Sequence, residues 1–90
     1  MSDPRAPRLA RKARLKWDAI ESRWMLLAPE RGIALSASAA AILKRCDGSA
    51  SIDAIAQALA EETRAPVDEV ARDVASFVTE MHARGLVEIA

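Results

Sequence analysis

The chain has few of the residues that build cofactor and catalytic sites. Cys46 is its only cysteine and His82 its only histidine. A single thiol cannot form a disulfide within the chain, and one cysteine with one histidine provide no cluster for a metal. Gly32, Gly48 and Gly85 are isolated from one another, which excludes a glycine-rich phosphate loop. The sequence therefore favours a binding protein over an enzyme, and we expect no cofactor and no metal.

Aromatic residues and long apolar runs are also scarce. The aromatic residues of this 90-residue chain are Trp17, Trp24 and Phe77, and its apolar fraction of 51% is rich in alanine. Ninety residues form one domain, and alanine favours helix. No apolar run approaches the ~18 residues of a membrane span, and no signal peptide is recognisable. We therefore expect a cytoplasmic protein with no membrane partner.

Charge is balanced over the whole chain but unevenly placed. Residues 1–31 carry eight basic and four acidic side chains, whereas residues 32–90 carry five and nine. The first dozen residues contain two prolines and no periodic apolar pattern. We therefore predict a flexible basic arm at residues 1–12 and a single folded domain at residues 13–90. Such an arm is either a solvated tail or a segment that attracts an acidic partner.

Three short strands are predicted before any helix. Polar and apolar residues alternate at 13–18, and a second strand follows at 23–28. Pro29 and Gly32 mark the next turn, in which Gly32 can adopt a positive φ, and the chain returns through a strand at 32–35. Such closely joined strands are typical of an antiparallel meander. Because its last strand has one partner, we expect its other edge to be open.

Three helices are predicted after the strands. The first covers 37–45, with Ser36 or Ser38 as its N-cap and Gly48 as its C-cap. The second covers 52–63, where apolar residues recur at helical spacing.

The third helix, at 66–84, begins at Pro66 and has the strongest periodicity in the chain. Its apolar stripe consists of Val67, Val70, Ala71, Val74, Phe77, Val78 and Met81. Residues 86–89 form either a final strand or a packed tail. The order predicts an α+β, winged-helix-turn-helix-like fold, with a three-stranded antiparallel sheet followed by a three-helix bundle.

Two kinds of partner fit this fold. A winged helix can bind DNA, but helix 66–84 carries four carboxylates against two arginines. Because phosphate charge opposes such a face, DNA binding is the less favoured alternative, and we expect no nucleic acid partner. An extended peptide could instead add as a strand at the open edge. The residues alone leave open whether the apolar stripe of the third helix lines a groove or is entirely core.

Four motifs, taken together and in order, resemble one family. They are P-E-R-G at Pro29–Gly32, A-A-A-I-L at Ala39–Leu43, C-D-G at Cys46–Gly48 and D-V-A-S-F-V at Asp73–Val78. The chain resembles the pyrroloquinoline quinone (PQQ) biosynthesis protein D (PqqD) family over roughly residues 15–89. It departs from the family at Pro66, where a serine-type cap is common, and its first dozen residues match no family motif.

The resemblance implies a non-enzymatic peptide chaperone in PQQ biosynthesis. Such a protein is a recognition element for ribosomally synthesised and post-translationally modified peptides (RiPPs). It binds the precursor peptide PqqA and presents it to the radical S-adenosylmethionine (SAM) enzyme PqqE. The iron–sulfur clusters and SAM belong to that partner, so the resemblance implies no cofactor here. A recognition element for a different modified peptide is the alternative within this fold.

The resemblance also implies where the peptide binds. In relatives the peptide adds to the third strand and packs against the third helix. Carried over, the ladder residues are Gly32, Ile33, Ala34 and Leu35, and the groove residues are Val70, Val74, Phe77 and Met81. Because an open edge can also pair between copies, we expect a monomer or a weak homodimer.

Overall fold

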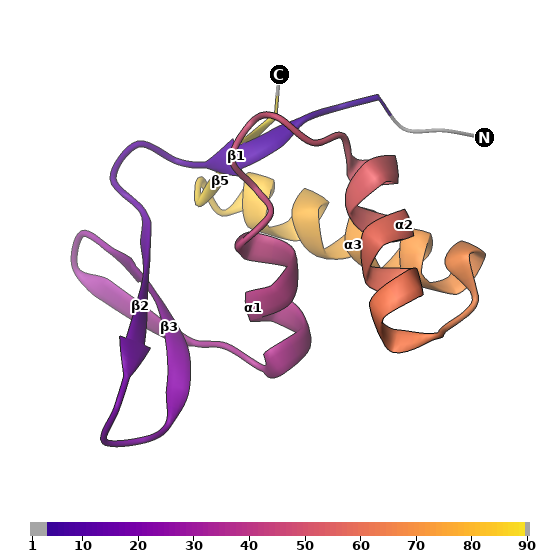
Figure 1. Cartoon of the computed structure of the whole chain (residues 1–90). Coiled ribbons are helices and arrows are strands. Elements are labelled where there is room, and N and C mark those ends of the chain that lie inside the picture. The colour runs from indigo at the N-terminus through magenta and orange to yellow at the C-terminus, as the bar shows by residue number, and fades with distance from the viewer. Residues whose placement is uncertain (1–3, 90) are drawn as a thin grey trace.

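The computed structural model describes residues 4–89, so residues 1–3 of the predicted arm lie outside it. The strands are β1 (Pro7–Leu9), β2 (Arg14–Asp18), β3 (Arg23–Ala28), β4 (Arg31–Ala34) and β5 (Val87–Ile89). The helices are α1 (Ala37–Leu43), α2 (Ile52–Thr63) and α3 (Val67–Ala83). Figure 1 shows α1 between the β2–β3 strands and α2. The predicted three-stranded sheet followed by three helices is confirmed.

The register of the β2–β3–β4 sheet separates an inner from an outer face. Leu26 of β3 lies opposite Leu15 on one side and Ile33 on the other. Side chains alternate along a strand, so this row shares one face, and the row of Lys16, Met25 and Ala34 shares the other. Leu26 is 0% exposed and belongs to the core between sheet and helices. Its row therefore defines the inner face.

Serine caps start the first two helices. The Ser36 hydroxyl accepts a hydrogen bond from the Ala39 N–H at 3.1 Å, which decides between the two predicted caps of α1. Ser51 does the same for α2, accepting from the Ala54 N–H at 3.0 Å. Pro66 is the N-cap of α3 rather than its first helical residue, and it makes no side-chain cap.

Two predictions about glycine are wrong. The β3–β4 turn consists of Pro29 and Glu30, and the positive φ of 66° falls on Glu30 rather than on Gly32. Proline followed by a residue of positive φ is the pattern of a type II turn. Gly48 does have a positive φ, but Lys44 is the C-cap of α1. The chain therefore turns earlier than its glycines indicate, and Gly32 lies within β4.

The predicted arm is partly built into the fold, which corrects the expectation of a flexible segment. β1 pairs antiparallel with β5, and Pro7 is fully buried. The Leu9 N–H donates to the Cys46 carbonyl at 3.1 Å, and the Ile52 N–H donates to the Arg5 carbonyl at 2.7 Å. A three-residue strand is too short to show periodicity, so its sequence resembles a loop. Residues 86–89 correspondingly contain a strand rather than only a tail.

The helices enclose one core. Its fully buried side chains include Leu43, Ile52, Ile55, Val74, Val78, Leu86 and Val87. Within residues 4–89, none of the helices combines the length and the apolarity that crossing a membrane requires.

Candidate functional site

Strand β4 is an edge of the sheet, and its ladder shows which of its backbone groups are unpaired. The Leu35 N–H donates to the Trp24 carbonyl at 3.0 Å, directly after the β3–β4 pairing. Hydrogen-bonded and non-hydrogen-bonded positions alternate in an antiparallel pair. Gly32 and Ala34 therefore direct their N–H and C=O groups away from β3. Among residues 4–89, these four groups have no hydrogen-bond partner.

The four predicted ladder residues thus fall into two classes. Gly32 and Ala34 supply donors and acceptors at the edge and are exposed. Ile33 and Leu35 face the helices and are partly buried against the core. An added strand would bond to Gly32 and Ala34, while its inner-face side chains would lie near Ile33 and Leu35.

The four predicted groove residues on α3 also differ from one another. Val70 and Phe77 are partly exposed and pack at the margin of the core. Val74 and Met81 are only 1% and 5% exposed, so both are core residues. They are buried because they fall on the same stripe as Val78, which points directly at the core. Of this set, Val70 and Phe77 are therefore the side chains that reach the surface.

A hollow of about 160 Å³ lies among the three helices. It is lined by Ser38, Ala41, Ile42, Leu59, Thr63, Val70, Asp73 and Val74. Val74 contributes to it despite being almost completely buried, so it forms part of the floor. The chain passes from β4 through the Ser36 cap directly to Ser38, which places the hollow beyond the end of β4. The sequence did not predict Ser38 or Asp73 here, because Ser38 is a candidate N-cap and Asp73 resembles a solvated helix position.

A hydrogen bond ties the edge strand to the end of α3. The Arg31 guanidinium donates to the Arg84 carbonyl at 2.8 Å. Arg31 begins β4 and Arg84 is the C-cap of α3, where carbonyl groups lack helical partners. This contact joins the start of β4 to the C-terminal end of α3.

Cys46 and His82 are engaged within the fold. The Cys46 thiol is buried and donates to the Ile42 carbonyl at 3.3 Å. Burial, with a smaller contribution from Asp47, raises the pKa of Cys46 to about 11, so the thiol is protonated at neutral pH and is a weak nucleophile. The His82 ring Nδ1 lies 2.9 Å from the Val87 carbonyl. Both groups stabilise the packing of the segments that they join.

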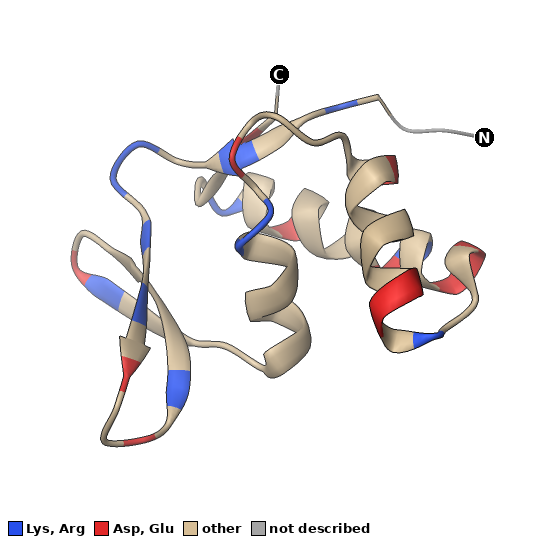
Figure 2. Ribbon diagram, in the orientation of Figure 1, with Lys and Arg blue, Asp and Glu red and all other residues tan. Residues whose placement is uncertain are grey.

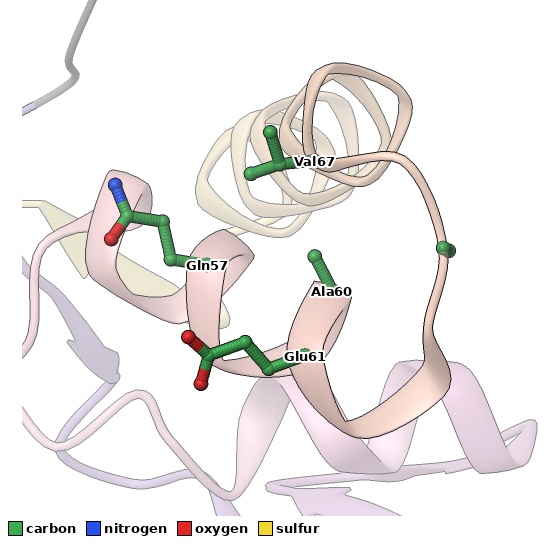
Figure 3. A pocket seen from close by; sticks show the side chains of 5 residues that line it. Gln57, Ala60, Glu61 and Val67 are labelled. Carbon is green, nitrogen blue, oxygen red and sulfur yellow. The ribbon is translucent and has the colours of Figure 1, made fainter.

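A second hollow lies between α2 and the start of α3 (Figure 3). Ala60 and Val67 face each other across it, and Gln57 and Glu61 stand on its α2 side. It contains none of the predicted site residues. The surrounding helix ends are acidic, whereas the strands are mainly basic, as Figure 2 shows.

Comparisons with known proteins identify the family of the chain. Residues 23–87 match the family described as Coenzyme PQQ synthesis protein D (PqqD). A relative from Rhizobium meliloti (strain 1021), named PqqA binding protein, is 44% identical over 82 residues, covering 91% of this chain and 84% of that protein.

Solved structures share the fold. The solution structure of the PqqD truncation of Methylobacterium extorquens PqqCD has a TM-score of 0.79 and 33% identity, covering 91% of this chain and 87% of that one. It represents a functional, stand-alone RiPP recognition element. Lasso peptide synthetase B1, complexed with its leader peptide, has a TM-score of 0.78 at 24% identity over 92% and 98% of the chains, which shows the fold alone. On the match at residues 23–87 and the 44% identity to its relative, this chain belongs to the PqqD family.

Proposed function

We propose that this protein is a peptide chaperone in PQQ biosynthesis, which binds the precursor peptide PqqA as a strand added to β4 and presents it to the radical SAM enzyme PqqE. The observation that carries the proposal is the set of four unpaired backbone groups at Gly32 and Ala34. They lie on an edge strand in a family whose relative from Rhizobium meliloti is named for binding PqqA. A ribosomally made precursor also fits a cytoplasmic chaperone.

Backbone pairing alone would bind the peptide weakly. Four hydrogen bonds of ~1 kcal/mol each correspond to a dissociation constant on the order of 1 mM. Burial of apolar peptide side chains must supply the rest. The partly exposed Ile33, Leu35 and Phe77 are positioned to provide it, with Val70 at the margin of the hollow. Val74 and Met81 support these residues from beneath as part of the core.

The proposed mechanism is tethering rather than bond chemistry. A chaperone that holds both peptide and enzyme raises the effective concentration of the peptide at the active site. The protonated thiol of Cys46 and the backbone-bonded His82 are engaged in packing, in keeping with a protein that is not an enzyme.

Titration of isotope-labelled protein with PqqA, followed by amide chemical shifts, tests the proposal. We expect the largest shifts at Gly32 and Ala34, followed by Val70 and Phe77. A PqqA peptide of scrambled sequence is the matched control and should leave these amides unchanged. Shifts confined to the hollow around Ala60 and Val67 would refute strand addition. An equal response to an unrelated RiPP precursor would favour the alternative of a different peptide.

A further inference from the structure

Strand β3 is apolar on both of its faces, although one of them points to solvent. Trp24 and Leu26 lie on the inner face, whereas Met25 and Leu27 lie on the outer face. An antiparallel sheet with one solvated face normally alternates apolar inward with polar outward. Met25 and Leu27 on the outer face of β3 depart from that pattern. Packing in the core between sheet and helices does not explain why these two positions are apolar.

The outer apolar side chains form a coherent surface. A Cβ built on Gly32 would lie 3.3 Å from Leu27 Cδ2 and 3.4 Å from Met25 Cε, so both side chains cover the glycine. At the β2–β3 turn, Ile20 is 93% exposed. A surface hollow of about 540 Å³ joins Ile20 to Met25 and Leu27. We call Ile20, Met25 and Leu27 the outer patch.

Cations flank this patch on the same face. Arg14 lies directly opposite Leu27, and Lys16 lies opposite Met25, so both can lay their aliphatic stems beside apolar neighbours. Arg23 follows on the same face of β3, opposite Asp18, whose carboxylate accepts hydrogen bonds from the Ile20 and Glu21 N–H groups, so the face carries three cations and one carboxylate. None of these three cations forms an ion pair with any residue in the range 4–89. Figure 2 shows the basic residues along β2 and β3, away from the acidic ends of the helices.

We propose that the outer patch is the docking surface for the peptide-modifying enzyme, through an apolar surface of the enzyme that is bordered by carboxylates. An apolar centre with a charged rim is the usual composition of a transient protein interface, and the unpaired cations specify an acidic partner. This inference rests on the proposed function, in which the chaperone binds an enzyme as well as a peptide.

The position of the patch also connects the two binding events. A peptide strand added to β4 would extend the sheet, and alternate peptide side chains would lie on its outer face. An enzyme docked on the outer patch would then contact those side chains as well as the chaperone. Peptide and enzyme therefore bind cooperatively, each raising the affinity for the other by the same factor.

The test measures binding of PqqE and of PqqA separately, by isothermal titration calorimetry on the full chain. The variants are Ile20→Ser and Lys16→Glu, both at exposed positions outside the peptide site. Their matched controls are Val67→Ser and Arg72→Glu, an exposed apolar and an exposed basic residue on α3 rather than on the sheet. We expect the double variant Ile20→Ser/Lys16→Glu to weaken PqqE binding by at least about tenfold. PqqA binding, and both controls, should stay within about twofold of wild type.

Several outcomes overturn the inference. PqqE affinity that is unchanged in the double variant, or absent in the wild type, refutes the docking surface while leaving PqqA binding intact. Absence of PqqA binding in the wild-type protein would instead refute the proposed function. A self-association in sedimentation that Ile20→Ser abolishes would assign the patch to a second copy. Binding of the patch to anionic phosphatidylserine vesicles would assign it to a membrane. Self-association or vesicle binding through the patch would each refute the enzyme as its partner.

Discussion

At the residue scale, neighbouring positions of β4 direct their backbone groups to opposite sides of the strand. Ile33 bonds to β3 through its backbone and turns its side chain to the core. Ala34 turns its backbone groups outward and has only a methyl group on the outer face. A substitution can therefore alter the edge without breaking the ladder that holds the strand in place, which makes the strand-addition hypothesis accessible to single variants.

The substitution Ala34→Pro removes one outward N–H donor that the β3–β4 ladder does not use. We expect PqqA affinity to fall by roughly fivefold to tenfold, the loss of about one net hydrogen bond. Calorimetry measures the affinity, and thermal unfolding shows whether the fold persists. Ala34→Ser retains the N–H and is the control, which should bind as wild type does. Undiminished affinity in a folded Ala34→Pro protein would contradict pairing at this residue.

The burial of Cys46 makes the folding stability of the protein depend on pH. Its pKa is raised from 9.0 to about 11, so the folded state holds the proton more tightly than the unfolded state does. The resulting stability is complete below pH 9 and is lost as pH rises through about 11. We expect the stability difference between wild type and Cys46→Ala to narrow over that range, as measured by urea unfolding at each pH. A difference that stays constant would show that the folded thiol titrates as an ordinary one.

At the element scale, α3 serves both the core and the surface. Its spacing turns Val74, Val78 and Met81 inward and leaves Val70 and Phe77 at the margin. Periodicity identifies the whole stripe but not its edges, because the depth of each residue depends on what packs over it. The elements that pack against α3, mainly α2 and β5 with α1 beside Val70 and Val74, decide which residues of the stripe are buried.

Paired substitutions on α3 separate these two roles. Phe77→Ala should weaken PqqA binding several-fold, because it removes a partly exposed apolar contact in the proposed groove. Val78 is fully buried, so Val78→Ala should lower the free energy of unfolding by about 2 kcal/mol and leave peptide affinity within about twofold. Chemical denaturation and calorimetry on both variants measure the two quantities. The reverse pattern would place Phe77 in the core and the groove elsewhere.

At the scale of the whole molecule, the two chain ends close the fold together. β1 and β5 pair with each other, and the Arg5 carbonyl accepts from the first N–H of α2. An N-terminal helix N–H has no partner within its helix, so this carbonyl acts as a backbone cap. The basic segment is thus a structural part of the domain from Arg5 onward, as well as a source of positive charge.

Deletion of residues 1–9 should therefore destabilise the domain. The β1–β5 pairing would be lost, together with the hydrogen bonds from the Leu9, Gly48 and Ile52 N–H groups and the burial of Pro7. We expect a loss of about 3 kcal/mol or more in the free energy of unfolding. Arg8→Ala, which breaks only the exposed ion pair with Glu88, is the control and should cost less than about 1 kcal/mol. A truncated protein as stable as wild type would contradict a structural role for this segment and support the predicted flexible arm.

The sequence by itself determined the order of the three-stranded sheet and the three helices, the two serines that could cap α1, and the periodic stripe of α3. These features depend on neighbours within a few residues, so local patterns carry them. The open edge at residues 32–35 was also predictable, within one residue, because a short meander leaves its last strand with a single partner.

Only the tertiary structure decided the rest. The pairing of β1 with β5 joins residues at the two ends of the chain, and no local pattern reports such a contact. The register with β3 assigned the unpaired groups to Gly32 and Ala34, and packing assigned Val74 and Met81 to the core. The outer patch likewise arises when alternation puts Met25 and Leu27 on the face opposite the helices. The burial of a side chain and the direction in which a backbone group points depend on which elements pack together. They therefore follow from the tertiary structure rather than from sequence spacing.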